Sequence, residues 1–213
     1  MLSRRELFCT VAGAGLCSRI ALSGDDDPFD ALPASVWKDP VTNGLVMIRH
    51  PAPAGITSET SLIKPGERGE RLTIDGRAFA PDGRTPVPGL TVYAYNTDAD
   101  GYYGERKAFY PPRIYGWVKT DGAGRFRMHT IRPGHYPKMQ VPAHVHFAAW
   151  GAGYPPQGNT GLQLAGDEYL TPQMMAEDAR LGTFHEIREL KREADGSWWC
   201  DFQFRVQKET TFH

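Results

Sequence analysis

Short strand-like runs separated by turn signals fill most of this chain, and they constrain its fold more than any other feature. Each run is rich in β-branched or aromatic residues and is bounded by an Asp-Gly, Pro-Gly or Gly-Ala-Gly signal, where turns are expected. Several short strands at this spacing are typical of two packed sheets. We therefore predict a mostly β protein, an antiparallel β-sandwich with long loops. The runs are RLTIDGRAF, LTVYAYN, RIYGWVKT, GRFRMHTI, AHVHFAAW and SWWCDFQFRV.

One segment clearly indicates a helix. The sequence TPQMMAEDARLG, residues 171–182, places Thr171 at the N-cap, Pro172 at the first helical position and Gly182 at the stop. We interpret Met174 and Met175 within this segment as packing residues. The prediction is one short helix near residues 171–182.

The composition supports one core with extensions. Of 213 residues, 40% are hydrophobic, which is enough for one sizeable domain. We assign residues 70–213 to the sandwich and residues 24–69 to an extended N-terminal arm that wraps the sandwich or meets a partner subunit, which leaves a homo-oligomer open. The formal net charge of −1 at pH 7 does not imply a nucleic-acid partner.

Side chains of metal-ligand type gather in the middle of the sequence. His144 and His146 are two residues apart in PAHVHF, so on a strand both rings project from one face and can hold one metal ion. Imidazole suits zinc, copper, iron or nickel, whereas two ionised phenols are hard anionic donors that favour Fe(III). Phenols occur nearby in GYYG and PGHYP. Taken alone, each motif is more often an ordinary strand or turn feature.

Three stretches around these residues resemble one enzyme family. They read GRAFAPDGRTPVPGLTVYAYNTDADGYYG, VKTDGAGRFRMHTIRPGHYP and VPAHVHF. In that order and spacing the chain resembles the intradiol ring-cleavage dioxygenases, which are non-haem Fe(III) enzymes. The resemblance covers roughly residues 70 to 170, and sparse helical segments make it closer to a protocatechuate-type core.

The resemblance implies one Fe(III) per chain and a set of four ligands. The family reads Gly-x-Tyr at Gly101, which selects Tyr103 over its neighbour Tyr102. It also implies that Tyr136 is a catalytic residue, because the matching tyrosinate leaves iron when substrate binds and takes a substrate proton. The implied ligands are Tyr103, Tyr136, His144 and His146.

Two positions depart from the family pattern. The family usually has Arg before P-A-H-x-H, where it stabilises charge that develops on the ring, but this chain has Val141. A Gln is usual about fifteen residues after the second His, where ungapped counting reaches Gly161. Gln163 lies two residues on, hence on the same face of a regular strand, and is our candidate catalytic replacement. Other side chains that could reach the site are Arg113, Arg132, Lys138 and His135.

The resemblance implies that a catecholic substrate binds Fe(III) through both oxygens and is cleaved by O2 to a cis,cis-muconate-type product. Two alternatives stay open from the sequence. One is a ferric-tyrosinate protein with slow or different activity, because Val141 and Gly161 omit the usual electrostatic help. The other is a non-catalytic transthyretin-like β-sandwich that serves as a binding module.

The first residues resemble an export signal. SRRELF and CTVAGAGLC combine a basic start with an apolar run too short to span a bilayer, followed by small residues near Ser23. We therefore predict a twin-arginine signal over residues 1–23, no membrane span and a periplasmic or extracellular location. Cleavage would remove Cys9 and Cys17 and leave Cys200 without an intramolecular disulfide partner.

The paired arginines generate a test of export. A reporter fused to residues 1–30 is expected to reach the periplasm, and changing Arg4 and Arg5 together to Lys is expected to stop it, because the twin-arginine machinery reads that pair. Fractionation of cells with and without this machinery measures the effect. Export that survives the double change would indicate a general secretory signal.

Overall fold

The computed structural model describes residues 52–107 and 112–209. The predicted signal over residues 1–23 and most of the predicted arm lie outside these ranges. Within them, no helix is long and apolar enough to cross a membrane.

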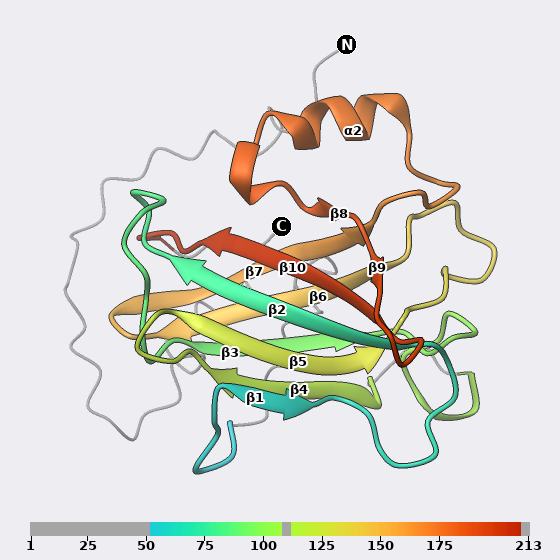
Figure 1. Ribbon diagram of the computed structural model, residues 1–213, viewed down its shortest axis with the longest axis horizontal. Helices are drawn as coiled ribbons and strands as arrows, with labels where there is room; N and C mark the ends of the chain where they lie inside the picture. The colour runs from blue at the N-terminus through green and yellow to red at the C-terminus, as the bar shows by residue number, and fades with distance from the viewer. Residues whose placement is uncertain (1–51, 108–111, 210–213) are drawn as a thin grey trace, which may run out of the picture.

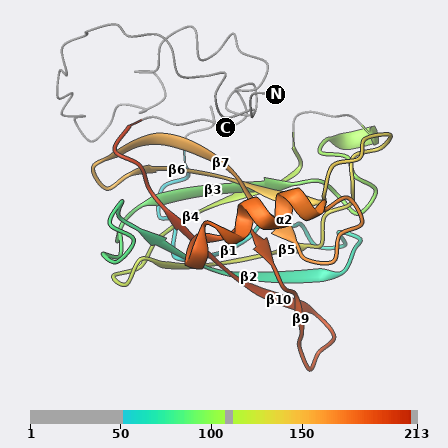
Figure 2. The same ribbon diagram turned by 90° about the horizontal axis from the view of Figure 1, so that it is seen from above.

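Two five-stranded sheets pack face to face (Figure 1). In the first sheet the order is β1 (Glu59–Ser61), β5 (Arg125–Ile131), β2 (Arg71–Phe79), β10 (Trp198–Arg205) and β9 (Lys191–Arg192). In the second sheet the order is β4 (Ile114–Lys119), β3 (Thr91–Asn96), β6 (His144–Gly151), β7 (Tyr154–Leu164) and β8 (Ile187–Arg188). Figure 2 shows the two sheets as separate layers, with β9 projecting beyond them. The predicted mostly β sandwich is confirmed.

Alternation along the strands explains the core between the sheets. In β2, Leu72, Ile74, Gly76 and Ala78 are buried, while Thr73, Asp75 and Arg77 alternate with them and are partly exposed. A period of two places alternate side chains on opposite faces, so one face of β2 is apolar. Gly76 completes that inward face, and its missing side chain leaves room for the ring of Phe126 on β5. Burying this apolar surface is the main force that holds the layers together.

The strand pairing is mixed and not purely antiparallel as predicted. Most neighbours are antiparallel, but β1 pairs with β5, β2 with β10 and β7 with β8 in parallel. Parallel pairing requires a long connection between the two strands. The chain between β2 and β10 supplies one, because it first builds the whole second sheet and returns along the free edge of β2. Such long-range returns leave no local signal in the sequence.

The predicted helix is present as α2 (Pro172–Ala179). The Oγ1 atom of Thr171 accepts a hydrogen bond from the backbone N–H of Met174 at 3.2 Å, which is the expected N-cap. A short 3-10 turn, η3 (Gly182–Phe184), follows. The packing role predicted for Met175 is wrong, because that side chain is 47% exposed and the helix has no buried residue.

The sandwich begins before residue 70, where the sequence analysis placed its start. The backbone oxygen of Thr57 accepts a hydrogen bond from Lys119 of β4, and that of Ser58 accepts one from Arg127 of β5. These bonds join the edges of the two sheets, and Leu62 is buried in the core. The end of the predicted arm is therefore part of the sandwich.

Candidate metal centre

The four predicted ligands meet on the outer face of the second sheet. Val145 of β6 points into the core, so the flanking His144 and His146 project from the opposite face. Tyr136 comes from the loop between β5 and β6, and Tyr103 from the loop that follows β3. The central strand thus supplies two donors, and two loops bring the others to it.

Each of the four donor atoms lies within hydrogen-bonding distance of at least two of the others. The Oη atom of Tyr136 is 2.9 Å from Nε2 of His144 and 3.3 Å from Nε2 of His146. The two Nε2 atoms are 2.8 Å apart, and Nε2 of His146 is 2.8 Å from Oη of Tyr103. The two phenol oxygens also contact each other. Four polar atoms are therefore aimed at one point.

Both imidazoles are held neutral. Burial lowers the pKa of His144 and lowers that of His146 well below its ordinary value of 6.5. Nδ1 of His144 is 2.7 Å from the carbonyl oxygen of Pro142, which can only accept, so Nδ1 carries the proton. In that neutral tautomer the Nε2 lone pair faces the other donors. This is the protonation state that a metal ligand requires.

The donor set fits a single metal ion. Two ligands that are each ~2.0–2.1 Å from one ion and about 90° apart lie roughly 2.9 Å from each other, close to the separations found here. Within the described residues no group of three or more His, Cys, Asp or Glu side chains is arranged to hold a metal ion. The phenols of Tyr103 and Tyr136 are therefore needed to complete the set. Their hard oxygens complement the two nitrogens, as expected for a ferric site.

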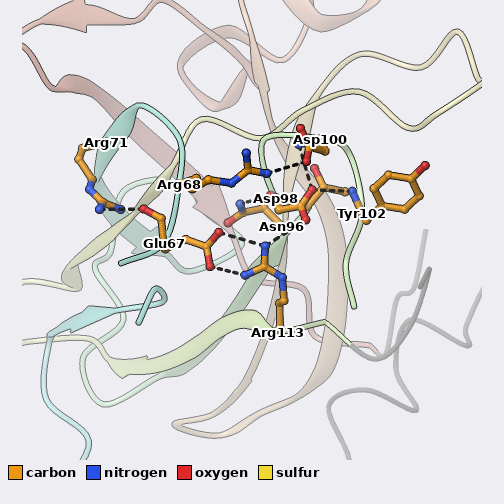
Figure 3. Close-up of polar contacts among 9 residues, drawn as sticks. Glu67, Arg68, Arg71, Asn96, Asp98, Asp100, Tyr102 and Arg113 are labelled. Carbon is orange, nitrogen blue, oxygen red and sulfur yellow. Dashed lines mark hydrogen bonds and ion pairs between the residues drawn. The ribbon is translucent and has the colours of Figure 1, made fainter. Parts of the chain in front are cut away.

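A network of charged residues fixes the loop that carries Tyr103. Asp98 Oδ1 accepts a hydrogen bond from the backbone N–H of Tyr102 at 2.9 Å, and the N–H of Arg113 donates to the carbonyl of Tyr103 at 2.8 Å. The guanidinium of Arg113 pairs with Asp98 at 3.0 Å and also with Glu67 (Figure 3). These carboxylates hold the pKa of Arg113 above its usual range. The network orients Tyr103, which is buried, and engages Arg113 away from the donor atoms.

The remaining candidates from the sequence have other contacts. Arg132 is exposed and lies 3.5 Å from a carboxylate oxygen of Glu70. Lys138 is exposed, and Val141 is partly buried in the same loop. His135 contacts Asp167 through Nε2 at 2.7 Å. Among the described contacts, none of these side chains reaches the four donor atoms.

A β-bulge changes the geometry predicted for Gly161 and Gln163. Gly161 has a φ of 70°, and the pairing of β6 with β7 shifts register between Val145 and Phe147. A β-carbon on Gly161 would lie 2.6 Å from the ring of Phe147, so this position has no room for Gln. Regular alternation from Gly161 to Gln163, which the prediction assumed, therefore does not hold. Gln163 instead lies directly opposite His144, on the same face.

Two contributors to the site were missed in the sequence. Tyr95 of β3 lies directly opposite His146 and stacks on its ring, with centroids 4.5 Å apart and planes at 12°. Asp167 links the two segments that carry Tyr136 and His144. Alternation within LTVYAYN places Tyr95 on the outer face of the sheet, but its contact with His146 follows only once β3 is known to pair with β6. The Ala-Gly-Asp sequence at Asp167 signals only a turn.

Comparison with known proteins gives one family. Residues 49–208 match the family model described as Dioxygenase. The chain is 31% identical over 160 residues to the 6-chlorohydroxyquinol 1,2-dioxygenase of Cupriavidus pinatubonensis, covering 67% of this chain and 55% of that protein. It is 32% identical over 120 residues to the protocatechuate 3,4-dioxygenase beta chain of Burkholderia cepacia, covering 51% of each. The chain thus spans about half the length of these curated relatives.

Solved structures share the fold. The dioxygenase domain of a carbohydrate-binding fusion protein from Streptomyces sp. SirexAA-E has a TM-score of 0.54 at 23% identity, with 76% of this chain and 96% of that one covered. The 3-chlorocatechol 1,2-dioxygenase of Rhodococcus opacus 1CP has a TM-score of 0.55 at 17% identity, with 72% and 68% covered. At these identities the likeness describes the sandwich alone.

Burial of the histidines predicts how the metal-free protein responds to acid. A histidine whose pKa is depressed in the folded state binds protons more readily when unfolded, so stability falls as pH drops below the unfolded value of about 6.5. His146→Gln removes that titration. Urea unfolding at pH 7.5 and pH 5.5 is expected to show a larger loss of free energy of unfolding in the wild type than in the variant. Equal losses would contradict a buried neutral imidazole.

Proposed function

This chain belongs to the intradiol ring-cleavage dioxygenases, and on that premise we propose that it uses Fe(III) and O2 to cleave a catecholic aromatic to a cis,cis-muconate-type product. One observation carries the proposal: two phenol oxygens and two imidazole nitrogens converge on one point of the sandwich surface. A transthyretin-like binding module does not require four converging metal donors, whereas a metal-dependent dioxygenase does.

We propose that the metal is held by both imidazoles and both phenols, one ion per chain. When bound, Fe(III) supplies a Lewis acid that favours the deprotonated catechol and orients it. The chain contributes neutral rings with lone pairs already aimed inward. The carbonyl of Pro142 fixes the tautomer of His144, and the stacked ring of Tyr95 fixes the plane of His146. Such outer contacts tune a metal site as well as orient its ligands.

The two tyrosines are not equivalent in their surroundings. Tyr103 is 1% exposed and sits in a loop tied down by Asp98 and Arg113. Tyr136 is only partly buried and lies in an open loop. We propose that Tyr136 is the donor that moves aside for substrate and takes one of its protons. Tyr103 stays in place, because its ring and its backbone are both held.

Gln163 is proposed to contact the bound substrate. It lies on the face of His144, and its buried Oε1 atom has no hydrogen-bond partner among the described residues. A buried unpaired oxygen is costly unless a ligand satisfies it. A hydroxyl or N–H group of the substrate would donate the missing hydrogen bond to this oxygen.

Turnover without the usual arginine is proposed to be slow. Val141 stands where the family places a guanidinium, and Arg113 is already paired with two carboxylates. Among the described residues no cationic side chain contacts the four donor atoms, so charge that develops in the transition state would lack that stabilisation. The proposed reaction stays intradiol cleavage, and the replacement of the usual arginine by Val141 bears on its rate.

The substrate is proposed to be a single-ring catechol. One relative is named for 6-chlorohydroxyquinol and another for protocatechuate, so catechol, protocatechuate and hydroxyquinol form the first panel. Oxygen uptake, with product identified by mass, measures the reaction. We also propose that residues 1–23 direct export. A measurement of molecular mass in solution tests whether the protein forms a homo-oligomer.

The ligand set gives a test on colour and iron content. His144→Ala and His146→Ala are expected to lose bound Fe(III), because each leaves three protein donors. Tyr103→Phe is expected to bleach or blue-shift the tyrosinate-to-Fe(III) absorption, whereas Tyr102→Phe is expected to leave it nearly intact. Iron analysis and visible spectroscopy measure both effects. Full iron occupancy in both histidine variants would rule out this metal centre.

The missing cation gives a test on rate. Val141→Arg is expected to raise kcat about tenfold, which corresponds to ~1.4 kcal/mol of transition-state stabilisation. Charge that appears only in the transition state affects kcat more than binding. Single-turnover kinetics with catechol and protocatechuate, at matched iron content, measure the change. A folded, iron-loaded variant that is no faster would show that this position does not limit the reaction.

A further inference from the structure

Asp167, in the turn after β7, is a buried carboxylate that joins three segments of the chain. Its side chain is only 4% exposed. Oδ2 lies 2.7 Å from Nε2 of His135 and accepts the backbone N–H of Ala143 at 3.0 Å. Oδ1 accepts the backbone N–H of Tyr169 at 2.9 Å. Both carboxylate oxygens therefore have hydrogen-bond partners, and these contacts lie outside the backbone pairing of the sheets.

Two of these partners are direct neighbours of proposed ligands. His135 precedes Tyr136, and Ala143 precedes His144. The chain between them is an open loop with exposed residues at 138–140. The carboxylate closes this loop at its base, so it sets the separation between the segment that carries one phenol and the strand that carries one imidazole.

We propose that Asp167 is a positioning residue that holds Tyr136 and His144 at the distance required for joint metal binding. The contact with the His135 ring restrains the residue just before Tyr136. The hydrogen bond from the backbone N–H of Ala143 restrains the residue just before His144, which is the first residue of β6. The edge of the His135 ring against Tyr169, with centroids 4.7 Å apart, supports the same arrangement.

This inference rests on the proposed iron site, and its expected size follows from similar outer contacts. Loss of a group that orients a metal ligand typically lowers metal affinity about 10- to 100-fold. Asp167→Ala is expected to weaken Fe(III) binding by that factor and to shift the tyrosinate absorption. The same variant is expected to speed hydrogen exchange at the Ala143 amide in the metal-free protein, because that N–H loses its acceptor.

Asp178 offers a matched control in the same protein. Its carboxylate is 12% exposed, accepts the backbone N–H groups of Glu186 and Ile187, and lies 3.6 Å from Nδ1 of His185. It thus resembles Asp167 in burial and partners but anchors α2 rather than a ligand segment. Asp178→Ala is expected to lower the melting temperature comparably and to leave iron affinity and colour unchanged.

The test compares both alanine variants with the wild type by iron titration, visible spectroscopy and hydrogen exchange of the metal-free proteins. Weaker iron binding and a shifted band in Asp167→Ala alone would support the positioning role. Equal behaviour of the two variants would overturn it. A wild type without a tyrosinate band would instead refute the proposed iron function. The positioning role of Asp167 would then be judged by hydrogen exchange at the Ala143 amide alone: faster exchange in Asp167→Ala would support it, and unchanged exchange would overturn it.

Substitutions of His135 separate positioning from general destabilisation, and they serve also if Asp167→Ala does not fold. His135→Leu removes the donor to Asp167, whereas His135→Gln can still donate an amide hydrogen. The expected result is a shifted band and weaker iron binding in His135→Leu with substantial recovery in His135→Gln. Identical losses in both variants, or no loss in either, would contradict the proposed bond.

Discussion

The alternation of side chains along β6 is the constraint on which both the fold and the site depend. Val145 and Phe147 fill the core between the sheets, and the two histidines beside Val145 necessarily face the other way. A shift of one residue in register would bury both imidazoles in the core and expose the apolar pair. Because the cost of that exchange is high, core packing itself fixes the direction of two metal donors.

The loops that bring the phenols to this strand are held by polar contacts rather than by apolar burial. Asp98 organises the loop of Tyr103 through backbone N–H groups and through Arg113. Asp167 contacts the loop of Tyr136 through the His135 ring at one end and the backbone N–H of Ala143 at the other. A carboxylate that accepts several N–H bonds can order irregular backbone without a strand ladder. Tyr103 is tightly held and Tyr136 is only partly buried, which is the contrast behind the proposal that Tyr136 moves aside for substrate.

Much of the architecture was predictable because its signals are local. Period-two patterns and turn residues gave the strands, and Thr171 with Pro172 gave the helix. The parallel pairs were not predictable, since they depend on which free edge a distant strand reaches. Counting along β7 failed at Gly161 for a related reason, because a bulge has no reliable signature when its opposing strand is unknown.

The sequence by itself determined which side chains could bind a metal and, through the spacing of His144 and His146, that two of them share a face. Tertiary structure decided the rest. Only folding brings Tyr103 and Tyr136 to that face, pairs Gln163 with His144 and engages Arg113 with carboxylates. The physical reason is that short-range spacing is set by backbone geometry, whereas contacts between distant segments depend on core packing and on hydrogen bonds that no single segment contains.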